Sequence, residues 1–228
     1  MKAMLLAAGR GERMRPLSER VPKPLLPVAG RPLIVHLIER LARAGFSELV
    51  VNVSHLAAHI EGVLGDGSRH GVRIVYSREE QALETGGGIA YALPLLGDAP
   101  FVALNTDIYC DFEFARLAAA RAALERGALA AHLVLVDNPP HHPAGDFSLA
   151  GGTVSADGVP RLTFSGIGVY SPALFAGVER GAKCQLVALL RPAMAQGRVA
   201  GEQHRGLWMD VGTPQRLADL ERRLAPPR

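Results

Sequence analysis

The chain has 228 residues, of which 48% are hydrophobic and 21% are charged, a composition ordinary for a soluble globular enzyme. Its net charge of +3 is too small to indicate a nucleic-acid partner by itself, although a local cluster of lysine and arginine can still bind an anion. The sequence has no membrane-length apolar run, no signal sequence and no pairing pattern for Cys110 and Cys184. We therefore expect a cytoplasmic protein without a membrane partner.

The first half of the chain alternates short apolar runs with helical patterns. Strands are expected at 2–8, 48–54, 72–77 and 101–107. A helix over 32–45 opens with Pro32 and ends at Gly45, with Glu39 and Arg43 as an exposed i,i+4 pair. A second helix is expected over 55–65, and the run at 83–93 is typical of a glycine-rich turn that enters a helix. This alternation predicts parallel strands with helices on both faces of the sheet.

The pattern changes after Asp137. Residues 138–172 are rich in glycine and proline and have short alternating runs, which are typical of β-hairpins added to a sheet. Helical patterns return from about Gln185 and again from Pro214. No repeat or linker divides the chain, so we expect one domain over residues 1–228, with halves at about 1–136 and 137–228.

The loop after the first strand has the composition of a phosphate-binding loop. Residues 5–28 read LLAAGRGERMRPLSERVPKPLLPV, and Gly9 and Gly11 free the backbone to wrap around an anion. Arg13 and Lys23 supply positive charge, whereas Arg15 is expected to be a surface charge. The loop is not a dinucleotide fingerprint, because methionine stands at the third glycine position and no acidic ribose ligand follows the second strand. It is not a Walker loop either, because the GK[ST] motif is missing.

Two carboxylates are candidates for a magnesium site. Asp107 follows a buried strand and Asp210 lies in WMDVGT, and hard oxygen ligands of this kind suit Mg²⁺ that bridges phosphates. Each aspartate alone is equally typical of a turn or a helix cap. The adjacent His141 and His142 have no metal-binding partner nearby and are expected to be loop histidines.

The opening stretch closely resembles the signature of the sugar-1-phosphate nucleotidyltransferases, LAxGxGxRMxPLT followed by PKPLxPV. Further matches are LETGGG, NTD, DNPPHHPAGDF, FSGIGVYSPALF and WMDVGTPQRL. The resemblance implies a Rossmann-like (GT-A-like) three-layer α/β/α fold with a mixed, mostly parallel sheet and an inserted β-hairpin subdomain on the substrate side. It also implies Mg²⁺-dependent transfer of a nucleotidyl group to a sugar 1-phosphate, with release of pyrophosphate. The half at 1–136 would bind the nucleotide, and the half at 137–228 would bind the sugar and close the site.

Within the family, the whole chain is most similar to the uridylyltransferases that use UTP and N-acetylmuramate α-1-phosphate in peptidoglycan recycling. The guanylyltransferases for mannose 1-phosphate and the uridylyl- or thymidylyltransferases for glucose 1-phosphate share the opening motif and remain alternatives. The choice of base and sugar is left open, because it depends on pocket shape and on a few hydrogen bonds from loops. The oligomeric state is left open as well.

The resemblance also implies roles for single residues. Lys23 would grip the α-phosphate, Arg13 the β- and γ-phosphates, and Asp107 and Asp210 would hold Mg²⁺; the expected catalytic residues are Arg13, Lys23 and Asp107. The other expected nucleotide contacts are Ala8, Gly9, Gly11 and Glu12, with Glu79, Gly86 and Gly87 toward the base. The expected sugar-side residues are Asn105, Gly145, Asp146 and Gly166.

Two positions depart from the family pattern. Thr106 stands where the family usually has glycine, and its β-branched side chain is expected to shift the metal site slightly. Ser18 replaces the usual threonine. The second lysine of the family's E-K-P motif has no counterpart in residues 153–166, so no residue is assigned to that role.

Overall fold

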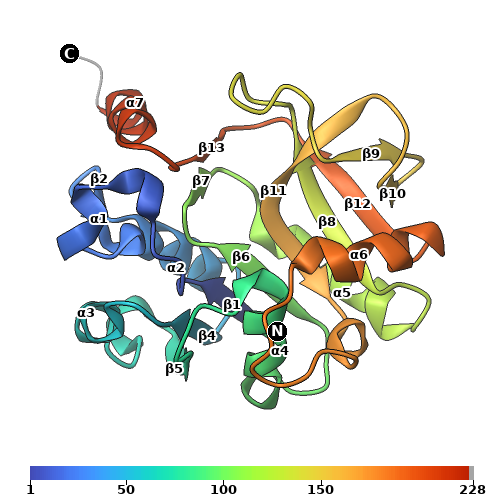
Figure 1. The fold of residues 1–228 in the computed structure, drawn as a ribbon, viewed down its shortest axis with the longest axis horizontal. Helices are drawn as coiled ribbons and strands as arrows, with labels where there is room; N and C mark the ends of the chain where they lie inside the picture. The colour runs from blue at the N-terminus through green and yellow to red at the C-terminus, as the bar shows by residue number, and fades with distance from the viewer. Residues whose placement is uncertain (226–228) are drawn as a thin grey trace.

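Short apolar runs form a nine-stranded sheet in the computed structural model, which describes residues 1–225 (Figure 1). The last three residues of the predicted half 137–228 lie outside the described residues. The sheet contains β1 (Lys2–Leu6), β4 (Glu48–Val53), β5 (Arg73–Arg78), β6 (Phe101–Asn105), β8 (Ala131–Val136), β9 (Phe147–Ala150), β10 (Thr153–Ser155), β11 (Arg161–Tyr170) and β12 (Val199–His204).

The strand order is β5-β4-β1-β6-β11-β8-β12-β10-β9. The strands from β5 to β6 are parallel, β11 runs antiparallel between β6 and β8, and β12 is parallel to β8. At the far edge, β9 and β10 form the hairpin expected after Asp137. Two short ribbons lie outside the main sheet and pair β2 (Pro27–Val28) with β3 (Arg31–Pro32), and β7 (Ile108–Cys110) with β13 (Trp208–Asp210).

Helices cover both faces of the sheet. Alternate side chains of β1 point to opposite faces: Ala3 and Leu5 pack in one core with α2, α3 and α5, and Met4 packs in another with α4 and α6. This arrangement confirms the predicted three-layer α/β/α fold with a mixed sheet. The helices are α1 (Leu17–Arg20), α2 (Leu33–Arg43), α3 (Ala57–Leu64), α4 (Glu84–Leu96), α5 (Leu117–Glu125), α6 (Leu186–Ala195) and α7 (Pro214–Leu224). Short 3₁₀ helices span Glu12–Met14, Lys23–Leu25, Ser68–His70, Phe114–Arg116 and Pro172–Phe175.

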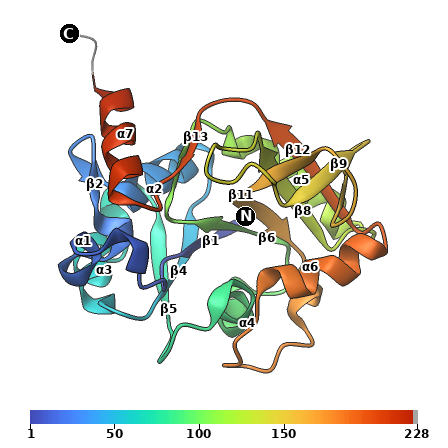
Figure 2. The ribbon, with the colours of Figure 1, turned by 45° about the horizontal axis from the view of Figure 1, so that its top comes forward.

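A third core joins the opening loop to the last helix. Met14 and Val28 from the N-terminal region pack with Val211 and Leu220, and all four side chains are fully buried. The backbone N–H of Ala29 also donates to Glu221 in α7 at 2.8 Å. Figure 1 and Figure 2 both place α7 beside β2. Contacts from the C-terminal part of the chain, including α7, therefore stabilise the opening loop.

Two local expectations were wrong. The glycines expected in a turn lie inside α4, because this helix already begins at Glu84. Both Gly86 and Gly87 pack against residues 182–186, where an added Cβ would collide with backbone atoms. Glu39 does not pair with Arg43. Its carboxylate accepts from Arg31 at 2.6 Å, because β3 leads directly into α2 and the long Arg31 side chain reaches Glu39.

Within residues 1–225, no helix combines the length and the apolar character needed to cross a membrane.

Candidate active site

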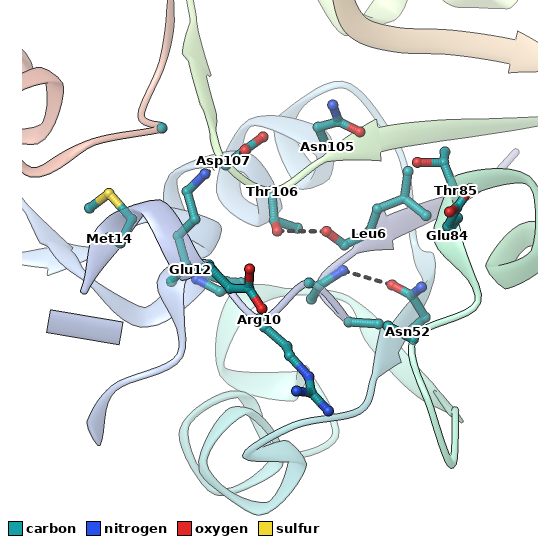
Figure 3. A pocket seen from close by; sticks show the side chains of 18 of the residues that line it. Leu6, Arg10, Glu12, Met14, Asn52, Glu84, Thr85, Asn105, Thr106 and Asp107 are labelled. Carbon is teal, nitrogen blue, oxygen red and sulfur yellow. Dashed lines mark hydrogen bonds and ion pairs between the residues drawn. The ribbon is translucent and has the colours of Figure 1, made fainter. Parts of the chain in front are cut away.

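A cavity of about 840 Å³ opens where the parallel strands end (Figure 3). Ligands of open α/β sheets bind at this edge, beyond the carboxyl ends of the strands. The walls come from the opening loop, the ends of β4, β5 and β6, and the segment that enters α4. The lining residues are 6–14, Lys23, Pro24, Asn52, Glu79, 82–85, 105–107 and Gly212.

Most of the predicted nucleotide residues line this cavity. Those that do are Ala8, Gly9, Gly11, Glu12, Arg13, Lys23 and Glu79, and Asn105, predicted for the sugar side, and Asp107, predicted for the metal, line it as well. Arg15 is exposed and does not line it, in agreement with the prediction of a surface charge. The predicted residues that lie elsewhere are Gly86, Gly87, Gly145, Asp146, Gly166 and Asp210.

The opening loop is tightly folded around Gly11. This residue has φ +63°, in the left-handed region that favours glycine, and a Cβ there would lie only 3.1 Å from Lys23 Cβ. Its carbonyl oxygen accepts from the Ser18 hydroxyl at 2.7 Å and from Met14 N–H at 2.8 Å. Ser18, the departure from threonine, keeps a hydroxyl that closes the loop. These contacts close the loop, and Lys23 lies against Gly11 and lines the cavity.

Lys23 and Asp107 form an ion pair in the cavity wall. Lys23 Nζ lies 2.5 Å from Asp107 Oδ2, and Lys23 is buried, with 9% of its surface exposed. A charge-assisted hydrogen bond of this kind fixes both side chains. The two groups expected to act on a phosphate and on a metal ion are therefore adjacent.

Asp210 ends β13, and its partner strand β7 begins directly after Asp107. Val211 N–H donates to the Asp107 carbonyl at 2.6 Å, so the two aspartates come from adjoining backbone. The Asp210 carboxylate contacts Arg216 at 2.9 Å and His141 Nε2 at 2.8 Å, and it faces a second cavity of about 320 Å³.

No group of three or more His, Cys, Asp or Glu side chains converges as a metal site within residues 1–225. Asp107 and Asp210, on adjoining backbone, both carry the hard oxygen donors that Mg²⁺ prefers. This ion is commonly bound by one or two carboxylates and takes its other ligands from phosphates and water.

Thr106 has a structural contact of its own. Its side chain is buried and its hydroxyl donates to the Leu6 carbonyl at 2.7 Å. Thr106 therefore joins the end of β6 to the end of β1, directly before Asp107. The expected shift of the metal site by Thr106 stays a prediction.

The predicted sugar-side residues form two groups. Asn105 lies against Gly166, where a Cβ would approach the Asn105 amide within 2.7 Å. Asp146 accepts from Phe164 N–H at 2.8 Å and lies 3.0 Å from His142 Nε2, next to Gly145. His141 and His142 lie in a loop as predicted, but each contacts a carboxylate. The first group borders the large cavity through Asn105, and the second stabilises the loop before β9.

Sequence reasoning missed several residues of the large cavity, including Arg10 and Asn52. Asn52 is buried in β4, and its amide joins Ala7 to Glu79. Burial raises the pKa of Glu79, and hydrogen bonds from Leu83 N–H and the Asn52 amide partly oppose this shift. One signal in the sequence was available: a single asparagine interrupts the apolar run ELVVNV, and a buried amide in a strand requires hydrogen-bond partners.

Comparison with known proteins places these features in a family context. Residues 2–147 match the family model described as nucleotidyl transferase. The chain is 51% identical over 225 residues, 97% of each chain, to the N-acetylmuramate alpha-1-phosphate uridylyltransferase of Neisseria meningitidis. It is 39% identical to the protein of the same name in Caulobacter vibrioides, over 98% of this chain and 96% of that one.

A solved structure from Bacillus anthracis shares the fold. That protein, assigned as a glucose-1-phosphate thymidylyltransferase, superposes with a TM-score of 0.84 over 100% of this chain and 98% of its own. At 19% sequence identity this similarity concerns the fold alone.

Proposed function

The chain belongs to the nucleotidyl transferase family, and we propose that it transfers the uridylyl group of UTP to N-acetylmuramate α-1-phosphate, forming UDP-N-acetylmuramate and pyrophosphate. The observation that carries this proposal is the juxtaposition of Lys23 and Asp107 in a cavity bounded by a phosphate-binding loop. The choice of UTP and of the sugar is supported by the 51% identity to the Neisseria enzyme, which extends over both halves of the chain.

The chemistry requires charge compensation more than proton transfer. An oxygen of the sugar phosphate attacks the α-phosphorus of UTP, the new P–O bond forms, and the bond to the bridging oxygen breaks as pyrophosphate leaves. The attacking oxygen is already anionic, so no general base is needed. Both reactants are negatively charged, and catalysis therefore depends on holding them together and stabilising the charge that develops.

We assign these tasks to residues of the large cavity and to Asp210, whose backbone adjoins that of Asp107. Lys23 binds the α-phosphate, and Arg13 binds the phosphates that leave. Lys23 Nζ has three N–H donors, so it can bind a phosphate oxygen beside or in place of its contact with Asp107. We propose that Asp107 and Asp210 hold Mg²⁺, which when bound supplies further positive charge at the α-phosphate.

The proposed setting is the cytoplasm and the recycling of peptidoglycan. UTP and the sugar phosphate are the proposed partners, with no nucleic acid or membrane involved. Cys110 and Cys184 are both free thiols, which suits a reducing compartment.

A substrate matrix tests the proposal. The purified chain is incubated with each of the four nucleoside triphosphates against N-acetylmuramate, N-acetylglucosamine, glucose and mannose 1-phosphates, and pyrophosphate is measured. The largest kcat/KM is expected for UTP with N-acetylmuramate 1-phosphate. A preference for GTP with mannose 1-phosphate, or for a glucose 1-phosphate pair, would instead establish one of the alternative activities and overturn the proposed substrates.

A further inference from the structure

Arg216 contacts both oxygens of the Asp210 carboxylate. Its Nη1 donates to Oδ1 at 3.0 Å and lies 2.9 Å from Oδ2. His141 Nε2 adds a third contact, 2.8 Å from Oδ1. The side chains of Arg216 and Asp210 are only 14% and 22% exposed. A charge-assisted contact of this kind, largely shielded from water, fixes the orientation of the carboxylate.

The first turn of α7 fixes Arg216 in turn. The Thr213 hydroxyl caps the helix and accepts from Arg216 N–H at 3.3 Å. Farther along α7, Leu220 packs in the third core with Val211, the residue directly after Asp210. The helix that carries the guanidinium is therefore anchored to the backbone that carries the carboxylate.

Gly212 leaves room for this ion pair. A Cβ on Gly212 would lie 2.1 Å from Arg216 Nη2 and 3.1 Å from Asp210 Oδ2. Gly212 does not have a positive φ, so glycine is needed here for space and not for backbone freedom. Gly212 lines the large cavity, whereas Arg216 and Asp210 line the second cavity. The ion pair thus borders the second cavity and packs against a residue of the large one.

Stability alone does not account for an arginine at this position. Its Nε is buried and has no hydrogen-bond partner within residues 1–225. A buried donor without a partner destabilises a fold, and apolar residues often replace a buried ion pair without loss of stability. The arrangement is better explained by what the guanidinium does for the carboxylate.

The contacts leave part of the Asp210 carboxylate open. An ionised carboxylate has about four lone-pair sites on its two oxygens. The contacts with Arg216 and His141 use three of them at most, so a site remains for a cation. Groups that hydrogen-bond to a metal-ligating carboxylate orient it, and their loss typically lowers metal affinity about 10- to 100-fold.

We propose that Arg216 is a positioning residue that orients the Asp210 carboxylate for Mg²⁺ and so sets the affinity of the site for the metal ion. Arg216 acts through Asp210 and does not touch the substrates. This inference rests on the proposed function in taking Asp210 as a ligand of Mg²⁺.

A double-mutant cycle between the two positions tests the proposal. The four proteins are the wild type, Arg216→Met, Asp210→Asn and the double variant R216M/D210N. Methionine keeps an apolar stem against the core but removes the charge and the donors. If Arg216→Met does not fold, Arg216→Gln, which keeps a polar amide at the end of the side chain, takes its place in the same cycle.

Three properties are measured for each protein. They are the Mg²⁺ concentration for half-maximal pyrophosphate release, the affinity for UTP by calorimetry in EDTA and in Mg²⁺, and thermal unfolding. Arg216→Met should raise the half-maximal Mg²⁺ concentration about tenfold. Its UTP affinity in EDTA should stay within about threefold of the wild type, whereas the gain in affinity when Mg²⁺ replaces EDTA should be smaller.

The double variant decides whether Arg216 acts through Asp210. With the carboxylate already lost, removing the guanidinium should change the half-maximal Mg²⁺ concentration by less than about twofold relative to Asp210→Asn. Independent effects that multiply in the double variant would overturn the proposal, because Arg216 would then act on the substrates directly. A half-maximal Mg²⁺ concentration that stays unchanged or falls in Arg216→Met would overturn it as well, since the guanidinium would then be neutral toward the metal or compete with it.

The matched control is Arg223→Met. Arg223 also belongs to α7 and lines the second cavity, but its side chain is exposed. Its Mg²⁺ requirement should equal that of the wild type, and a rise as large as in Arg216→Met would show that the net charge of the cavity matters and not the contact with Asp210.

Failure of the proposed function is distinguishable from failure of this inference. If the wild type uses another nucleoside triphosphate or another sugar phosphate, the proposed substrates fail, and the same cycle with the true pair still tests Arg216. A wild type that is fully active in EDTA would remove Asp210 as a metal ligand and would overturn the inference with it.

Discussion

At the scale of single residues, the candidate site is built on charged side chains that form ion pairs with one another. Lys23 contacts Asp107, and Asp210 contacts Arg216 and His141. Motifs predicted that Lys23, Asp107 and Arg13 act together, and the structure brings Lys23 and Asp107 into contact. Asn52 could not be found in this way, because its role depends on a hydrogen bond to a residue 27 positions away. Its partners are visible only once β4 and β5 lie side by side.

Removing the charge of Lys23 should abolish most turnover. Lys23→Ala is expected to lower kcat by about two orders of magnitude or more, as is typical when a group that stabilises transition-state charge is lost. Pyrophosphate release under saturating substrates measures the effect. The control is Arg15→Gln, which removes an exposed charge outside the cavity and should retain activity within about twofold. Near-wild-type kcat in folded Lys23→Ala would remove this residue from the mechanism.

The buried carboxyl of Glu79 should leave a signature in the pH dependence of stability. Burial raises its pKa above the ordinary value of 4.5. The contribution of Glu79 to the free energy of unfolding is therefore fully present below pH 4.5 and is lost as the pH rises through the folded-state pKa. Relative to Glu79→Gln, the wild type should be more stable at pH 4.5 than at pH 7.5. Urea unfolding of both proteins at the two pH values measures this difference, and a difference that grows with pH would show that the shift has the opposite sign.

At the scale of elements, glycine was the residue hardest to interpret from sequence. A run of three glycines is typical of a turn, yet in α4 each glycine permits a close approach of another segment. The helix periodicity of α2 and the apolar runs of β1, β4 and β6 were recognised because they are local patterns. The pairing of β7 with β13 was not, because their residues lie about a hundred positions apart and the strands are short.

Replacing a glycine of α4 by alanine should change the stability of the protein in the opposite direction from replacing a helical glycine that has free space around it. Gly62→Ala should stabilise the protein by about 0.5–1 kcal/mol through helix propensity. Gly87→Ala should destabilise it by about 1–3 kcal/mol, because the new methyl group overpacks against the Ala182 carbonyl. Urea unfolding of both variants gives the two signs. A stabilised Gly87→Ala would mean that the 182–186 segment moves aside without cost.

The β7–β13 ribbon should make catalysis dependent on a divalent cation. Chelation by EDTA is expected to abolish pyrophosphate release, and excess Mg²⁺ should restore it. In Asp210→Asn the Mg²⁺ concentration for half-maximal activity should rise at least about tenfold, because one of two carboxylate ligands is lost. Full activity in EDTA would contradict the proposed metal requirement. An unchanged Mg²⁺ requirement in Asp210→Asn would exclude Asp210 as a ligand.

At the scale of the whole molecule, one sheet continues through both predicted halves of the chain, 1–136 and 137–228. The alternation of strands and helices predicted the parallel half, and the glycine- and proline-rich stretch predicted the hairpins of the other half. The docking of α7 on the opening loop could not be predicted, because it depends on buried contacts between residues such as Met14 and Leu220 at opposite ends of the chain. The predicted family is confirmed, whereas the roles of the single site residues remain predictions.

The central claim is that this cavity joins UTP to N-acetylmuramate α-1-phosphate. Phosphorus NMR of the purified chain with these two substrates and Mg²⁺ follows every phosphorus atom through the reaction, and mass spectrometry identifies the nucleotide product. UDP-N-acetylmuramate and pyrophosphate are expected to appear in equal amounts, and neither should form with Lys23→Ala. Absence of the nucleotide sugar, or release of UMP in its place, would contradict the proposed function.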